Sequence, residues 1–150
     1  MGNCNCNLKS NHYKSCRQFY NAATQAVGTS FAPLALTGAE VTDTGVSIGM
    51  NGNAIQIEHS GLFRISGTIS FLATTAGVVT AEMYINGIPA SETMRIRTVE
   101  VGNNQIDFET IRSFRTMCGQ NPQNIQFMIM TDGTAAGSVT FVSGNAIKEA

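Results

Sequence analysis

The sequence predicts an all-β fold, a sandwich or barrel of short antiparallel strands, on three observations. Apolar and polar residues alternate with a period of two over several stretches, as expected of strands with one buried face. Turn-forming dipeptides, above all Asn51-Gly52 and Asn86-Gly87, separate these stretches. The stretches are short and recur at roughly even spacing along most of the 150 residues, a pattern that favours a sandwich or barrel.

The clearest strand is expected over residues 61–71, GLFRISGTISF. Its large apolar residues share one parity and its polar residues share the other, which places Phe63, Ile65, Ile69 and Phe71 on a buried face. Residues 78–85, VVTAEMYI, alternate in the same way. Shorter strands are expected over residues 54–58, 125–130 and 138–142.

Two segments permit more than one interpretation. Residues 106–118 place Phe108, Ile111 and Phe114 three apart, which suits a helical turn, but the neighbouring strands favour a strand. Residues 14–27 contain no Gly or Pro and permit a short helix with poor caps. We expect residues 1–24 to form an attachment segment, flexible or ordered by a partner, and residues 25–150 to form the β domain.

Charge is scarce and unevenly distributed. Charged residues make up 13% of the chain, and the net charge is −1. The residues before Glu40 carry three positive charges and no acid, whereas the rest carries a net charge of −4. This excludes a nucleic-acid-binding domain, which needs a basic stripe. No apolar run approaches the ~20 residues that span a bilayer, and no apolar signal region is seen at the start, so neither a membrane partner nor export by the general pathway is expected.

The first 16 residues contain a group of metal-ligand side chains: Cys4, Cys6, His12 and Cys16. Thiolates and a neutral imidazole suit tetrahedral zinc, although C-x-C is tighter than the usual spacing. Disulfides within or between these segments, and reduced cysteines in a partner-bound segment, are the alternatives. Myristoylation of Gly2 is disfavoured because position 6 is Cys. The basic and aromatic residues expected to make the attachment are Lys9, Lys14, Arg17, Phe19 and Tyr20.

No enzyme is predicted. GVSIG, residues 45–49, matches the nucleophile-elbow pattern around Ser47, but it lies in an alternating run without a following helix. The one later histidine, His59, sits between strands as a solvated residue. Arg95 and Arg97 share a face, Arg112 and Arg115 follow later in the chain, and these arginines suit an anionic partner or glycan. Salt bridges are the simpler expectation for them, with Glu92, Glu100, Asp107 or Glu109.

Residues 59–93, HSGLFRISGTISFLATTAGVVTAEMYINGIPASET, resemble the centre of the tumour-necrosis-factor-like jelly-roll superfamily. The resemblance is to the branch of complement globular heads, collagen-like bacterial surface glycoproteins, and phage fibre or decoration domains. The family pattern begins here with Ser60-Gly61 and with Phe63, which opens an alternating strand to Phe71. A second alternating strand, residues 78–85, and the Asn86-Gly87 hairpin follow. Residues 117–133 and 138–150 look like a later Gly-then-strand step and the closing strand. The resemblance covers residues 25–150, without a preceding Gly-X-Y tract.

The resemblance implies an antiparallel jelly-roll sandwich that forms a homotrimer around a threefold axis. Aromatic residues agree with it, because one small core does not obviously need all of them; each is otherwise simply a core residue. The candidates for the subunit interface are Phe31, Phe108, Phe114, Phe127 and Phe141.

Together these features predict a structural display protein: a trimeric knob that residues 1–24 attach to a larger assembly. A phage capsid or fibre is the expected assembly, with the knob on the virion exterior in a decoration, head-fibre or adhesion role. The alternative is a trimer of a bacterial cell or spore surface that binds glycans. The expected partners are further copies of the chain, a capsid or fibre protein, and a host-surface glycan; no cofactor is expected except zinc at the cysteine-rich segment.

Overall fold

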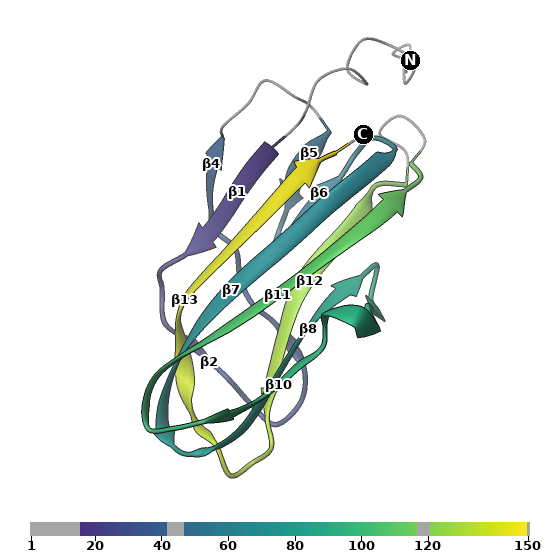
Figure 1. The fold of residues 1–150 in the computed structure, drawn as a ribbon. Helices are drawn as coiled ribbons and strands as arrows, with labels where there is room; N and C mark the ends of the chain where they lie inside the picture. Colours follow the sequence, from purple (N-terminus) through teal and green to yellow (C-terminus); the bar gives the residue numbers. More distant parts are fainter. Residues whose placement is uncertain (1–15, 42–46, 117–120, 150) are drawn as a thin grey trace.

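The chain forms two antiparallel β-sheets packed face to face, as the computed structural model shows for residues 16–41, 47–116 and 121–149 (Figure 1). Paired strands are antiparallel throughout these ranges. The predicted fold class, an all-β jelly-roll sandwich, is confirmed. The chain crosses repeatedly from one sheet to the other, so most strands that pair within a sheet are distant in sequence.

Sheet A contains the three longest strands of the described chain. Its order is β11 (Gly102–Phe114), β7 (Gly61–Thr75), β13 (Ala136–Lys148), β1 (Cys16–Asn21) and β4 (Gly38–Val41), with β2 (Gln25–Ala26) also pairing with β13. The β7–β13 pairing contains two register shifts, one of them between Val139 and Phe141. Such bulges bend a strand and increase its local twist.

Sheet B is built from shorter strands. Its order is β10 (Arg95–Val99), β8 (Gly77–Ile85), β12 (Gln123–Thr131), β6 (Ala54–Ile57) and β5 (Ile48–Asn51); β3 (Ala32–Pro33) pairs with β12, and β9 (Ile88–Pro89) pairs with β8. A short 3-10 helix, η2 (Ser91–Thr93), lies beside β8. Its Thr93 hydroxyl accepts a hydrogen bond from the Met83 amide at 2.8 Å and donates one to the Ala90 carbonyl at 2.7 Å.

The structure corrects the expectation for residues 14–27. Residues 16–21 form neither a helix nor a separate attachment segment, because β1 pairs with β13 on one side and with β4 on the other. The alternation of Phe19, which is fully buried, with exposed neighbours fits a strand that covers the core with one face. The β domain therefore begins at or before Cys16 rather than at residue 25, and residues 1–15 lie outside the described ranges.

Other local predictions are confirmed or refined. Residues 102–114 form β11, so the strand interpretation of this region was right. The Asn86-Gly87 turn has φ of 52° and 79°, as a type I′ turn requires. The first hairpin is also present, but Asn51 pairs with Ala54, so its turn is centred on Gly52 and Asn53 rather than on Asn51 and Gly52.

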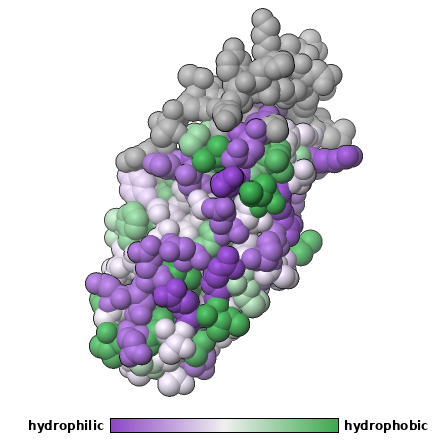
Figure 2. All heavy atoms as spheres, in the orientation of Figure 1, coloured by the Kyte–Doolittle hydropathy of each residue, from purple (hydrophilic) through white to green (hydrophobic). Residues whose placement is uncertain are grey.

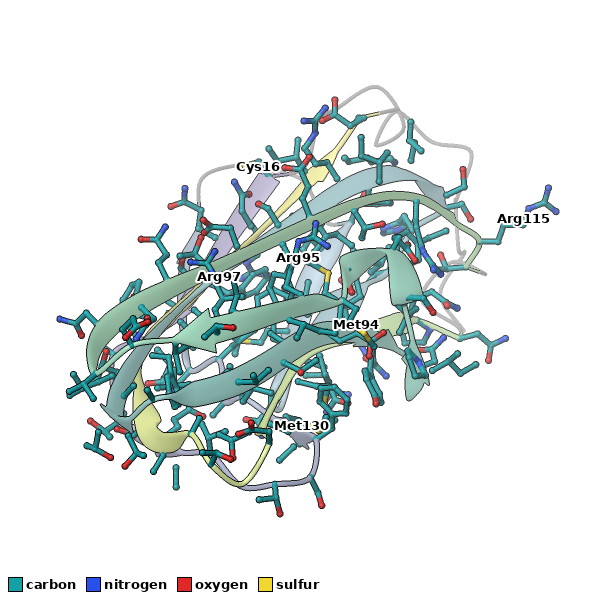
Figure 3. The ribbon with its side chains drawn as sticks, turned by 60° about the horizontal axis from the view of Figure 1, so that its bottom comes forward. Cys16, Met94, Arg95, Arg97, Arg115 and Met130 are labelled. Atoms are coloured by element: carbon teal, nitrogen blue, oxygen red, sulfur yellow. The ribbon has the colours of Figure 1, made fainter. Side chains whose placement is uncertain are left out.

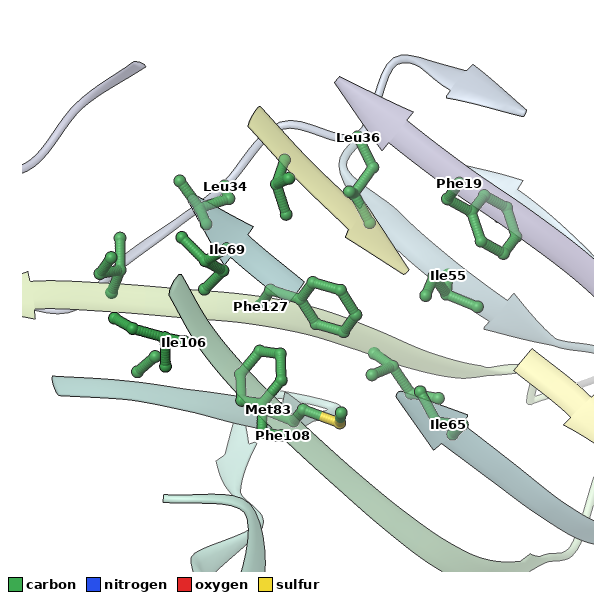
Figure 4. Close-up of a cluster of buried hydrophobic side chains, with 14 of the residues drawn as sticks. Phe19, Leu34, Leu36, Ile55, Ile65, Ile69, Met83, Ile106, Phe108 and Phe127 are labelled. Atoms are coloured by element: carbon green, nitrogen blue, oxygen red, sulfur yellow. The ribbon is translucent and has the colours of Figure 1, made fainter. Parts of the chain in front are cut away.

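The core lies between the sheets and is closed at its centre by aromatic rings (Figure 4). Across sheet A, one inward-facing row reads Phe19, Gly144, Gly67 and Phe108. The two glycines leave a hollow between the phenylalanines, and Phe127 of sheet B fills it, 5.0 Å from Phe108 between ring centroids. Any side chain at either glycine would collide with these rings, so glycine is required here by packing.

Candidate subunit interface

The outward face of sheet A carries a shallow hollow of about 630 Å³, which we call the sheet A groove. The front of Figure 2 is this face, where hydrophilic residues are interleaved with separate hydrophobic ones. The outward-facing side chains that line the groove are Gln18 and Tyr20 of β1, Ser66 and Thr68 of β7, and Phe141, Ser143 and Asn145 of β13.

Strand register explains why the groove forms. One outward-facing row reads Tyr20, Ser143, Thr68 and Asp107 across four strands, because residues directly opposite one another share a face. The next row reads Gln18, Asn145, Ser66 and Glu109, again with the longer side chains on the outer strands. Small side chains on the two central strands leave the hollow, and Tyr20 forms one of its walls.

The uncharged surface continues along the sheet. A second hollow of about 440 Å³ adjoins the groove through Phe141, and its other lining residues are hydroxyl and amide side chains of β7, β11 and β13. Phe141 lies at the register shift in β13 and is 38% exposed. The same face exposes three further large apolar side chains, Tyr20, Leu72 and Ile111.

The charges that border this face lie along β11 and at the ends of the strands, where Arg64 pairs with two acids. Arg64 lies 3.6 Å from the carboxylate of Glu109 and 3.2 Å from that of Glu149. Asp107 accepts a hydrogen bond of 2.7 Å from the Thr68 hydroxyl. A face with neutral hydroxyls and amides at its centre loses less on desolvation than a charged one, so another protein surface can cover it.

The five phenylalanines expected at a subunit interface lie in three different places. Phe108, Phe114 and Phe127 are at most 5% exposed and form part of the core of one chain, so they have no surface to offer a neighbouring subunit. Phe31 lies on the sheet B side, 5.7 Å from the Tyr84 ring. Only Phe141 belongs to the outward face of sheet A. The prediction that Phe108, Phe114 and Phe127 form a subunit interface was therefore wrong, and the alternative that they are core residues was right.

Tyr20, predicted as an attachment residue, lies in the sheet A groove. Of the other attachment candidates, Phe19 is buried in the core, and Arg17 donates a hydrogen bond to the Ile48 carbonyl at 2.9 Å. Lys9 and Lys14 lie outside the described residues.

The predicted metal ligands fall mostly outside the described ranges. Cys4, Cys6 and His12 lie there, as does Cys118. Cys16 begins β1, with its sulfur 3.8 Å from the Asn145 side-chain oxygen. Within the described ranges, no three His, Cys, Asp or Glu side chains gather as a metal site would require. No helix there is long and apolar enough to cross a membrane.

Of the expected salt bridges, the structure contains that of Arg112 with Glu92. Glu92 binds Arg112 through two hydrogen bonds of 2.6 and 2.9 Å, and this pairing lowers the pKa of Glu92 to about 2. Arg95 instead donates to the backbone carbonyls of Glu92 and Met94. Arg95 and Arg97 lie on β10, beside β11 (Figure 3), and neither has an ion pair within the described part of the chain.

Ser47 and His59 do not form a nucleophile site of the elbow type. Ser47 precedes strand β5 and not a helix, and its carbonyl accepts a hydrogen bond from the Glu58 amide at 2.8 Å. Ile48 belongs to β5, as expected for this motif, whereas Gly45 and Val46 lie outside the described residues.

The two sheets and their strand order define an antiparallel jelly-roll sandwich. Solved structures agree. Murine APRIL at pH 8.5 superposes with a TM-score of 0.60 and 12% identity, over 91% of this chain and 99% of that one. PRD1 vertex protein P5 superposes with a TM-score of 0.55 and 13% identity, over 89% and 72% of the two chains. No protein-family model matches the sequence, and no curated protein matches it either.

Proposed function

We propose that the chain is a structural display protein, a trimeric jelly-roll knob on the exterior of a phage virion. The observation that carries the proposal is the partly apolar outward face of sheet A with its groove of uncharged side chains. The likeness to a PRD1 vertex protein and to APRIL supports the fold on which the proposal rests.

Self-association explains features of this face that a solvated surface does not need. Tyr20, Leu72, Phe141 and Ile111 expose apolar area on one side of the molecule, and copies that bring these faces together remove it from water. The small residues in the groove let a side chain from a neighbouring copy approach the sheet closely. A closed ring of identical copies is the common way to bury one such face in every subunit.

Residues 1–15 complete the proposal as the attachment segment. They contain no acid and two lysines, and they precede β1 at one end of the sandwich. Three copies around an axis present three such segments, and the second and third attachments become intramolecular, which strengthens a weak single contact.

The mass of the full-length protein in solution tests the association. Native mass spectrometry should give three times the chain mass of 16.0 kDa. Ser143→Arg puts a long cation into the groove and should yield monomers with unchanged circular dichroism. Thr98→Arg, at an exposed outward position of sheet B, is the matched control and should stay trimeric. A monomeric wild type, or equal behaviour of the two variants, contradicts the proposed interface.

Attachment is tested separately, on particles assembled with the full chain and with a chain that begins at residue 16. Loading should be lost in the shorter chain although it remains trimeric. Equal loading would remove the attachment role from residues 1–15 and leave the knob itself intact.

A further inference from the structure

One end of the sandwich gathers buried polar atoms that have no hydrogen-bond partner. Five such side-chain atoms occur in the described chain, and four of them belong to Arg17, Ser47, His59 and Lys148. Arg17 lies at the start of β1, Ser47 just before β5, His59 just after β6, and Lys148 at the end of β13. These strand ends form the upper end of the sandwich in Figure 1. Because buried polar groups in folded proteins are nearly always hydrogen-bonded, four exceptions at one end need a physical explanation.

The two cations point into the space between the sheets. Arg17 is opposite Ala146 in the β1–β13 pairing, and Lys148 shares the inward parity of Ala146 two residues further along β13. Arg17 reaches sheet B, because its Nη1 donates to the Ile48 carbonyl, next to Ser47, while its Nε remains unpartnered. Lys148 is only 2% exposed, and its Nζ has no acceptor.

Other polar groups at the same end have hydrogen-bond partners within the described chain. The Ser60 hydroxyl donates to the Thr116 carbonyl at 3.0 Å and accepts from the Thr116 amide at 2.9 Å. The Thr116 hydroxyl donates to the Glu58 carbonyl at 2.9 Å.

The described acids at this end are not placed to neutralise the buried cations. The Glu149 carboxylate is engaged with Arg64, and the Glu58 carboxylate lies against Gly49 on the outward side of sheet B. Burial lowers the pKa of Lys148, the response expected of an ammonium group without a counter-ion. Residues 1–15 contain no Asp or Glu, so their side chains cannot supply the missing charge; the segment 42–46, outside the described ranges, contains Asp43.

We propose that this end of the sandwich binds a carboxylate side chain of an acidic partner segment, with Lys148 and Arg17 as counter-charges and Ser47 and His59 as hydrogen-bond partners. The inference deepens the proposed function, on which it rests, because Cys16 and so the junction with the attachment segment lie at the same end. The long stem of Lys148 lets its ammonium group move toward a docked carboxylate while the methylenes stay packed.

Calorimetric titration of the full-length protein tests the site with two probes, a hexaglutamate peptide and inorganic phosphate. Lys148→Met removes the buried charge and keeps an unbranched apolar side chain. This variant should fold at least as stably as the wild type, since it removes an uncompensated buried cation. Arg115→Met is the matched control, because Arg115 is an exposed cation beyond the end of β11 that points away from the molecule (Figure 3).

The peptide should bind the wild type and the Arg115→Met variant equally, and Lys148→Met and Arg17→Met should each weaken its Kd at least about tenfold. Absence of peptide binding, or an equal Kd in Lys148→Met, overturns the proposal. Phosphate binding as tight as that of the peptide would overturn the acidic segment as occupant and assign the site to a free anion. The native mass of the same samples reports on the trimer independently, so failure of this site is distinguishable from failure of the proposed function.

Discussion

Replacement of Gly144 by alanine tests how tightly the centre of the sandwich is packed. A Cβ atom at this position would lie 2.8 Å from two ring carbons of Phe127 and 3.4 Å from Cδ1 of Ile55. Favourable carbon–carbon contacts lie at about 3.5–4.0 Å, so the ring must move. Its other side is occupied by Phe108, 5.0 Å away between centroids, which leaves little room for that movement.

The expected loss of stability follows from two opposing terms. Overpacking a filled core costs about 1–3 kcal/mol. Alanine also reduces the conformational entropy of the unfolded chain, which stabilises the folded state by about 0.4–1 kcal/mol. We therefore expect Gly144→Ala to reduce the free energy of unfolding by about 1–2 kcal/mol, and the melting temperature by roughly 2–8 °C for a domain of this size.

Urea unfolding followed by far-ultraviolet circular dichroism measures this loss, at one fixed protein concentration because association shifts apparent stability. Gly28→Ala is the control, since no atom lies within 4 Å of its added methyl group and its φ is not in the left-handed region. The control should be as stable as the wild type or slightly more so. Equal stabilities of the two alanine variants would refute the packing argument.

A double-mutant cycle identifies Phe127 as the obstacle. Combined with Phe127→Leu, which shortens the ring, Gly144→Ala should cost less than it does alone, with a coupling energy of about 0.5–3 kcal/mol. Additive losses would mean that the strain lies elsewhere.

Three further predictions concern polar groups. Thr93→Val keeps the shape but leaves the Met83 amide without its acceptor, so the free energy of unfolding in urea should fall by about 1–3 kcal/mol. Arg112 lowers the pKa of Glu92 to about 2, so the stabilisation of the fold by this carboxylate is complete above pH 4.5 and is lost as the pH falls toward 2. Both side chains are partly exposed, so Glu92→Gln should lower the free energy of unfolding by at most about 1 kcal/mol at pH 7. Near pH 2 the variant and the wild type should be equally stable, as urea unfolding at the two pH values will show. Burial and the nearby Glu92 raise the pKa of Glu82. The folded state therefore opposes ionisation of Glu82, which lowers the stability of the fold once the pH exceeds 4.5. Glu82→Gln should raise the melting temperature at pH 7 but not at pH 4.

Local pattern determined much of the secondary structure. The period-2 alternation placed the large apolar residues of β7 on the buried face, where Phe63, Ile65 and Phe71 are fully buried. A strand face depends only on parity, which the sequence displays directly. The Asn86-Gly87 turn was predictable for the same reason, because positive φ at two successive residues favours these two amino acids.

The subunit face was harder to predict. Composition suggested that aromatic rings would form it, yet three of the five proposed rings pack in the core. The uncharged groove that the structure shows is made by small residues such as Ser143 and Thr68, which become neighbours only through strand register. No single-strand pattern marks them, because each is an ordinary polar residue on an exposed face.

The sequence by itself determined many of the strands, their buried parity and an all-β sandwich or barrel, since these follow from nearest-neighbour geometry and turn chemistry. The jelly-roll class was implied by the family resemblance of residues 59–93. Only the tertiary structure decided that residues 16–21 belong to sheet A and that Arg17 and Lys148 share one end of the sandwich. Those relations depend on pairings such as Cys16 with Ile147. Backbone hydrogen bonds between residues so far apart carry no local signature, because any strand of suitable parity can make them.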